Sequence, residues 1–137
     1  MDDGFRWIEE DHRKIEEQFQ NYLRDNEEPM LRELCEHLTQ HTHVEETVLY
    51  PMLRRFVDGG DDLADRAQEE HAQIATMVAA LYDSATPDRV ADLVADLHRS
   101  VAEHVAEEET TILPALRDCP VDAAELAIEL EGAGTTR

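Results

Sequence analysis

Residues 41–54, HTHVEETVLYPMLR, recur without gaps at residues 104–117 as HVAEEETTILPALR, with seven identities in fourteen positions. In each copy a glutamate follows the leading histidine four residues later, which gives the pairs His41–Glu45 and His104–Glu108. Four residues turn an α-helix by roughly 400°, so the two side chains of each pair share one helix face. Shorter echoes stand upstream of each copy: Asp11-His12 with Ile15, and Glu70-His71 with Ile74. This duplication predicts two copies of a helical hairpin.

Glycine and proline divide the rest of the chain into four long segments. No β-branched or aromatic run alternates with period two, whereas apolar residues recur at helical spacing, as in Phe5, Ile8, Ile15, Phe19 and Tyr22. Helices are predicted at about residues 3–24, 29–57, 61–83 and 86–119, and prolines 51 and 114 are expected to bend two of them. The predicted fold is all-α, an up-down-up-down four-helix bundle. It is assigned to residues 1–119, and residues 120–137 are assigned to a short C-terminal helix at 122–130 and a flexible tail from 132 onward.

Each of the four apolar stripes has one gap, and a histidine fills it. The inward histidines are His12, His41, His71 and His104. Glu45 and Glu108 point inward with them, and no lysine or arginine lies on these seams. An ionised carboxylate in an apolar core is costly unless it is paired or binds a metal. The sequence therefore predicts metal binding by these six residues.

The duplication also predicts how the six side chains are arranged. A pseudo-two-fold axis would bring His12 and His41 opposite His71 and His104, with Glu45 near the axis beside its counterpart. This arrangement suits two metals bridged by two carboxylates. Mixed imidazole and carboxylate donors suit iron, manganese or zinc, and iron is the leading choice. The Glu-x-x-His spacing of ferritin-like di-iron bundles occurs at Glu9–His12 but not before the other three histidines.

Composition narrows the possible partners. The 137 residues hold 33 acidic and 12 basic side chains, for a formal charge of -21. Such a surface repels phosphate backbones and anionic lipids, so neither nucleic acid nor a membrane is expected as a partner. No transmembrane span or signal peptide is visible, and two cysteines, Cys35 and Cys119, cannot staple a fold of this size. The expected location is cytoplasmic, with both thiols free.

In these residues the chain resembles the hemerythrin family, specifically the bacterial hemerythrin-like proteins with an HHE cation-binding domain. Their repeated mark is His-x3-Glu followed by Leu-Tyr/Phe-Pro, which residues 41–51 match closely and residues 104–114 match except for Ile112-Leu113. The resemblance covers about residues 5–117. It implies a non-haem centre of two iron ions, oxo- or hydroxo-bridged, with Glu45 and Glu108 as bridging carboxylates. A diatomic ligand such as O2 or NO, or peroxide, would bind at an open position.

The sequence departs from the marine-worm oxygen carriers of that family at two positions. Those carriers use five histidines, whereas Ala67 stands one turn before His71 here, and their last carboxylate is an aspartate at a spacing of five. The resemblance thus implies less saturated coordination, which His37, Tyr50 or water could complete. Tyr50 lies about 140° from Glu45 on an unbent helix, which favours interhelical packing.

The remaining polar residues receive simpler interpretations. His43 and His98 are expected at the surface, and Glu46, Glu70 and Glu109 either in solvent or in hydrogen bonds to the metal ligands. Arg54 and Arg117 stand near helix ends, where they complement the helix dipole.

Two functions from different classes remain open. The protein binds O2, NO or peroxide for sensing or storage, or it is a di-iron enzyme that acts on peroxide, nitric oxide or ferrous iron. A zinc-loaded structural bundle is a third option that gives no reason for bridging carboxylates.

Overall fold

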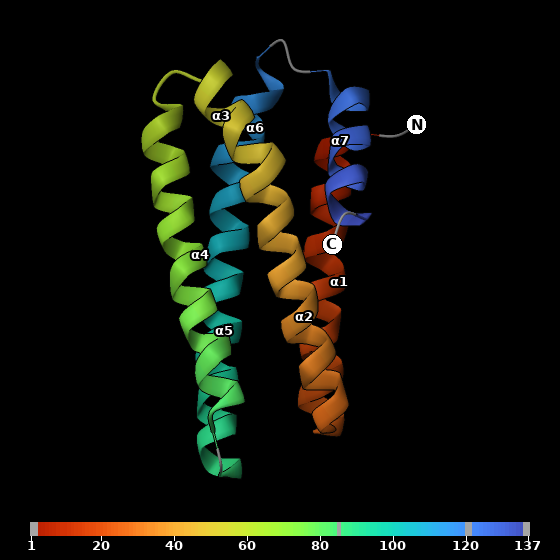
Figure 1. The fold of residues 1–137 in the computed structure, drawn as a ribbon, viewed down its shortest axis with the longest axis vertical. Coiled ribbons are helices and arrows are strands. Elements are labelled where there is room, and N and C mark those ends of the chain that lie inside the picture. Colours follow the sequence, from red (N-terminus) through yellow and green to blue (C-terminus); the bar gives the residue numbers. More distant parts are fainter. Residues whose placement is uncertain (1–2, 85, 120–121, 136–137) are drawn as a thin grey trace.

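The computed structural model describes residues 3–84, 86–119 and 122–135, and these residues form a bundle of long helical rods (Figure 1). The rods are α1 (Gly4–Asp25); α2 (Glu28–Val44) continued by the π-helical turn η1 (Glu45–Leu49) and α3 (Tyr50–Phe56); α4 (Gly60–Tyr82); and α5 (Pro87–Glu107) continued by η2 (Glu108–Ile112) and α6 (Leu113–Arg117). A shorter helix, α7 (Ala123–Thr135), follows. Short connections make consecutive rods antiparallel, so the predicted all-α bundle is confirmed.

Local signals place the ends of the rods. The Asp3 carboxylate accepts hydrogen bonds from two amides of the first turn of α1, and Asn26 ends that helix with φ at 52°. Thr86 caps α5, and Pro87 occupies its first turn, as the sequence predicts. At the start of α4 a Cβ on Gly60 would lie 1.9 Å from a backbone oxygen of α3, so only glycine fits this tight connection.

The two rods that carry the His–Glu pairs each widen into one π-helical turn that ends two residues before a proline. The backbone amide of Tyr50 donates to the carbonyl of Glu45, and the amide of Leu113 donates to the carbonyl of Glu108, five residues back. Proline lacks an N–H, and its ring collides with the carbonyl four residues earlier, so an ordinary α-turn is unfavourable at that point. The expected bends are therefore realised as widened turns, and these change which residues share a face with the glutamates.

Buried apolar side chains form two clusters on either side of the six polar residues. Along α1, Phe5 and Ile8 belong to one cluster and Ile15 and Phe19 to the other, with His12 between them. The apolar faces of the rods thus turn inward above and below a polar layer. Within residues 3–84, 86–119 and 122–135, no helix is long and apolar enough to cross a lipid bilayer.

Helix α7 packs on α1 at one end of the bundle (Figure 1). Leu126 and Leu130 are fully buried in the same cluster as Phe5. A Cβ on Gly4 would lie 2.4 Å from Leu126 Cγ, so the glycine lets the two helices approach closely. The helix extends to Thr135, and the prediction of a loose tail from residue 132 is wrong for residues 132–135. Contacts of Ala133 with the buried cluster stabilise this last turn, and residues 136–137 lie outside the described part.

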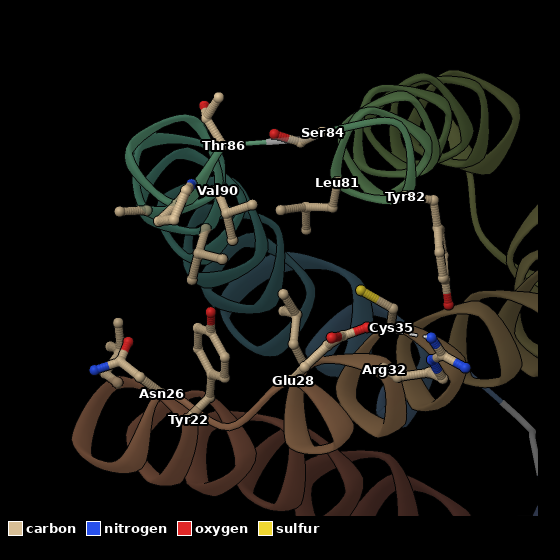
Figure 2. A pocket seen from close by; sticks show the side chains of 15 residues that line it. Tyr22, Asn26, Glu28, Arg32, Cys35, Leu81, Tyr82, Ser84, Thr86 and Val90 are labelled. Atoms are coloured by element: carbon tan, nitrogen blue, oxygen red, sulfur yellow. Dashed lines mark hydrogen bonds and ion pairs between the residues drawn. The ribbon is translucent and has the colours of Figure 1, made fainter.

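A pocket of about 620 Å³ opens at the opposite end of the bundle, between the α1–α2 and α4–α5 connections. In Figure 2 the Tyr22 hydroxyl points into it, and the ion pair of Glu28 with Arg32 lies beside it. None of the six predicted metal-binding residues lines this pocket. The chemistry predicted from the sequence therefore belongs to the interior of the bundle and not to this opening.

Candidate metal centre

The structure brings the six predicted metal-binding side chains together in one buried layer. All four rods contribute, with His12 from α1, His41 from α2, Glu45 from η1, His71 from α4, His104 from α5 and Glu108 from η2. None of the six is more than 5% exposed. Four imidazoles and two carboxylates thus share a space where an uncompensated charge is costly.

The donor atoms separate into two groups of four residues. One ligand atom from each of His12, His41, Glu45 and Glu108 lies within 4.8 Å of the other three, and the same holds for His71, His104, Glu45 and Glu108. We call these the first and the second group. In the first group, His12 Nε2 lies 2.9 Å from Glu108 Oε1 and His41 Nε2 lies 3.1 Å from Glu45 Oε2. In the second group, His71 Nε2 lies 3.0 Å from Glu45 Oε1 and His104 Nε2 lies 3.3 Å from Glu108 Oε2.

Each carboxylate divides its two oxygens between the two groups. Glu45 faces the first group with Oε2 and the second with Oε1, while Glu108 faces the first with Oε1 and the second with Oε2. A carboxylate that presents one oxygen to each of two positions is placed to bridge two cations. The arrangement has the pseudo-two-fold form that the duplicated sequence predicts.

The Tyr50 hydroxyl lies inside the second group. It donates a 2.9 Å hydrogen bond to Glu108 Oε2 and lies 3.0 Å from His71 Nε2 and 3.4 Å from His104 Nε2. Tyr50 is fully buried. Of the two roles left open for Tyr50, the structure favours the donor role over interhelical packing, because the hydroxyl contacts the donor atoms themselves.

The π-helical turn explains why the Tyr50 hydroxyl lies among the donor atoms. On a straight α-helix five residues separate two side chains by about 140°, but a π turn holds about one more residue, so Tyr50 returns to the face of Glu45. Pro51, directly after Tyr50, is the residue in the sequence that signals this irregular turn. In the second copy of the repeat Leu113 holds the corresponding position, so the first group has no phenol of its own.

A carboxylate faces the outer nitrogen, Nδ1, of every one of the four histidines. The pairs are His41 with Asp11, His12 with Glu109 at 2.7 Å, His104 with Glu70 at 2.8 Å and His71 with Glu46 at 3.7 Å. The three hydrogen-bonded partners, Asp11, Glu109 and Glu70, fix the ring orientation and leave the lone pair on Nε2, which points to the centre. His71 Nδ1 is too far from Glu46 for a hydrogen bond. Of the two roles left open for Glu46, Glu70 and Glu109, the structure gives Glu70 and Glu109 hydrogen bonds to ligand-type histidines, whereas the Glu46 side chain is 42% exposed and makes no hydrogen bond to His71. Asp11 was not singled out, although it precedes His12 as Glu70 precedes His71.

The donor set fits metal ions, because several of its buried polar atoms have no hydrogen-bond partner. Among the described residues, His12 Nε2, His41 Nε2, Glu45 Oε2 and Glu108 Oε1 are buried and have no hydrogen-bond partner. These are the four inward atoms of the first group. Buried polar atoms without partners are rare because each costs free energy, and cations held by these atoms would compensate them.

Without metal, the carboxylates shift the protonation of His12, His41 and His104. Burial by itself would lower the pKa of His12 and His104, but the neighbouring carboxylates of Glu108 and Glu45 raise both pKa values to about 11. Burial opposes protonation of His41 as well, while Glu45 and Asp11 raise its pKa to about 9. For Asp11, burial favours a higher pKa, yet hydrogen bonds from His37 and His41 hold it well below its usual range. Protons thus take the place of metal charge in the metal-free protein.

The other polar residues singled out from the sequence lie outside the two groups. His37 contacts Asp11 and Gln18, His43 is exposed, and His98 pairs with Glu16 while its ring stacks on Phe19. Arg54 pairs with Asp61 and Asp65 at the start of α4, and Arg117 pairs with Glu9 of α1. Both arginines thus connect rods, a role that the helix-dipole interpretation did not include.

Comparison with known proteins identifies the family to which this chain belongs. A DNA nickase from Nostoc sp. (strain PCC 7120 / SAG 25.82 / UTEX 2576) is 34% identical over 117 residues, which cover 81% of this chain and 32% of that protein. The chain therefore spans about a third of the length of this relative. No solved structure is significantly similar to this chain. The family model for the hemerythrin HHE cation binding domain matches residues 3–116, which include all six buried donors, and the chain belongs to the hemerythrin HHE cation-binding family.

Proposed function

We propose that this protein is a non-haem di-iron protein that binds O2, NO or peroxide for sensing or storage. The observation that carries the proposal is the division of the Glu45 and Glu108 oxygens between two groups of buried donors. One metal ion needs only one such group, whereas two ions use all six side chains. The first ion would be held by His12 and His41 and the second by His71 and His104.

Iron is favoured among the metals that take imidazole and carboxylate ligands. It supplies reversible change of oxidation state and affinity for small oxygen and nitrogen ligands, and the phenol of Tyr50 is a donor suited to ferric iron. The chain contributes a buried interior, three histidine rings held by outer carboxylates, and two glutamates placed to bridge the ions.

The two metal positions differ in how fully this chain surrounds them. Tyr50 adds a fifth donor to the second group, while Leu113, its counterpart in the repeat, adds none to the first. The exogenous ligand therefore binds at the first group. L113Y would add a phenol on that side and should abolish binding of azide or NO while two metals stay bound.

A di-iron enzyme is the second candidate, and the donor set offers one observation in its favour. Ala67 is buried where a fifth histidine would stand, so a phenol takes the place of an imidazole in the second group. A phenolate stabilises the ferric state more than an imidazole does, which favours oxidative turnover of peroxide, nitric oxide or ferrous iron over reversible binding of O2.

One experiment separates the two candidates. Metal-free protein is loaded with ferrous iron under anaerobic conditions and mixed with O2, NO or peroxide while optical spectra are recorded. Stable adducts that are lost when the ligand is removed support sensing or storage. Multiple turnovers of peroxide, nitric oxide or ferrous iron support an enzyme. Protein that takes up one zinc and no iron would rule out both.

We propose that this chain does not act on nucleic acid, although the Nostoc relative is called a DNA nickase. The formal charge of -21 opposes association with a polyanion, and the match covers 32% of that protein. Electrophoresis of supercoiled plasmid with the iron-loaded protein at low salt should show neither a shift nor a nick. Retarded migration or nicking of the plasmid would show that nucleic acid is a partner of this protein.

A further inference from the structure

His37 continues the hydrogen bonding of His41 toward the surface. Asp11 accepts a hydrogen bond from His41 Nδ1 with Oδ2 and one from His37 Nε2 with Oδ1, the latter at 2.8 Å. His37 Nδ1 contacts the amide oxygen of Gln18. The side chain of His37 is 23% exposed and that of His41 only 4%. A continuous series of contacts therefore leads from a half-buried amide to a ligand-type imidazole of the first group.

The internal duplication provides a comparison within the same molecule. Glu70 holds His104 Nδ1 at 2.8 Å, as Asp11 holds His41, but the described residues give Glu70 no second partner. The offset that relates His41 to His104 also relates His37 to Ser100. Of these two corresponding positions, only that of the first group carries a side chain that contacts the orienting carboxylate.

A second donor on Asp11 restricts how this carboxylate can turn. A carboxylate with one partner can rotate and exchange that partner for water, whereas one held at both oxygens keeps its direction. The orientation of a ligand histidine, and the basicity of its metal-binding nitrogen, follow the carboxylate on its other nitrogen. His37 therefore acts on His41 through Asp11 and does not contact the metal position itself.

We propose that His37 is a positioning residue of the first group, which holds His41 through Asp11 and makes the two metal positions unequal in affinity. This inference rests on the proposed two-metal centre.

The test is a titration of metal-free protein with zinc ions, followed by calorimetry and by the ultraviolet absorption of tyrosine. Because Tyr50 lies in the second group, the tyrosine signal marks the filling of that group. H37L should weaken the step that is silent in tyrosine absorption about tenfold and leave the other step within about twofold. H37Q keeps an N–H donor near the position of Nε2 and should restore most of the affinity.

Two further variants separate positioning from a general structural role. His98 is the matched control, because its side chain is 26% exposed and bonded to Glu16 at 2.8 Å but contacts no donor of either group, so H98L should change neither step. D11N should weaken the same step as H37L, and H37L added to D11N should cost less than a further twofold.

The zinc titrations can contradict the role of His37 separately from the two-metal centre. If the wild type binds two zinc ions, four results would each overturn the role of His37 and leave the two-metal centre standing. The first two are an unchanged affinity in H37L and an equal weakening of both binding steps. The other two are an effect of H98L as large as that of H37L, and effects of H37L and D11N that multiply in the double variant. Fewer than two ions in the wild type would overturn both proposals. H37A replaces H37L if circular dichroism shows that the latter does not fold.

Discussion

The Tyr50 hydroxyl donates a 2.9 Å hydrogen bond to Glu108 Oε2, although the two residues stand in different copies of the repeat. Burial raises the pKa of Tyr50 well above its usual value, and the charges of Glu45 and Glu108 raise it further. In metal-free protein the phenol is therefore neutral and donates its proton. A cation in the second group reverses this balance, because it favours the phenolate and compensates both carboxylates.

Y50F should remove a visible absorption band from the ferric protein. Phenolate bound to ferric iron absorbs in the visible range, and Tyr50 is the tyrosine whose hydroxyl contacts donor atoms of the second group. The control is Y82F, because Tyr82 is 58% exposed and lies beside the pocket at the far end of the bundle. An unchanged visible spectrum of ferric Y50F would show that the phenol is no ligand.

The bundle and its six donors could be predicted from the sequence because both depend on a regular repeat. Histidines that interrupt apolar stripes, and glutamates one helical turn later, stay on the inner face wherever the helix is regular. The same rule places Tyr50 off the face of Glu45, because it assumes an α-helical turn where the chain forms a π-helical one. Asp11 was missed because its role depends on its approach to His41 from another rod, and spacing along one helix carries no such information. The last turn of α7 formed despite Gly132 because tertiary packing outweighed local propensity.

E45Q should destabilise the metal-free protein at pH 7 by about 3–5 kcal/mol, as expected when one partner of a buried ionic network is removed. Glu45 is fully buried and faces His12, His41 and His71. E46Q is the matched control, because the Glu46 side chain is 42% exposed and its ion pair with His71 is as long as 3.7 Å. Its effect should stay within about 0.5 kcal/mol. Urea unfolding with a chelator present measures both, and equal effects would mean that Glu45 carries no charge compensation.

The metal-free protein should lose stability as the pH rises above neutrality. The pKa values of His12 and His104 are raised to about 11 and that of His41 to about 9, from an ordinary value of 6.5. Groups with a raised pKa in the folded state contribute fully below the unfolded value and lose that contribution as the pH rises through the folded value. Urea midpoints in chelator should therefore fall steadily between pH 7 and 10. A midpoint that rises over this range would contradict the protonated cluster, and H98L, remote from both groups, should reproduce the wild-type trend.

Cys35 and Cys119 should remain free thiols under oxidising conditions, even beside redox-active iron. Cys35 stands six residues before His41, and Cys119 fifteen residues after His104. His41 and His104 both face Glu45, so the two histidines share one level of parallel rods, and the rise of 1.5 Å per residue separates the thiols by ~30 Å. A disulfide needs Cα atoms within roughly 7 Å of each other. Cys35 lies in the buried cluster near the pocket, whereas Cys119 Sγ donates to the backbone of Phe56 at the end that carries α7 (Figure 1).

The reactivity of the two thiols should also differ. Cys35 is 2% exposed, and burial raises its pKa to about 11, so little thiolate forms near pH 8. Cys119 is half-buried next to the end of α6. Iodoacetamide added to folded protein at pH 8 should therefore label Cys119 first, and Cys35 should react at a comparable rate only after urea is added. Peptide mass spectrometry measures both rates. A Cys35–Cys119 link in folded protein would overturn the parallel arrangement of the rods that carry the two His–Glu pairs, and with it the geometry of the metal centre.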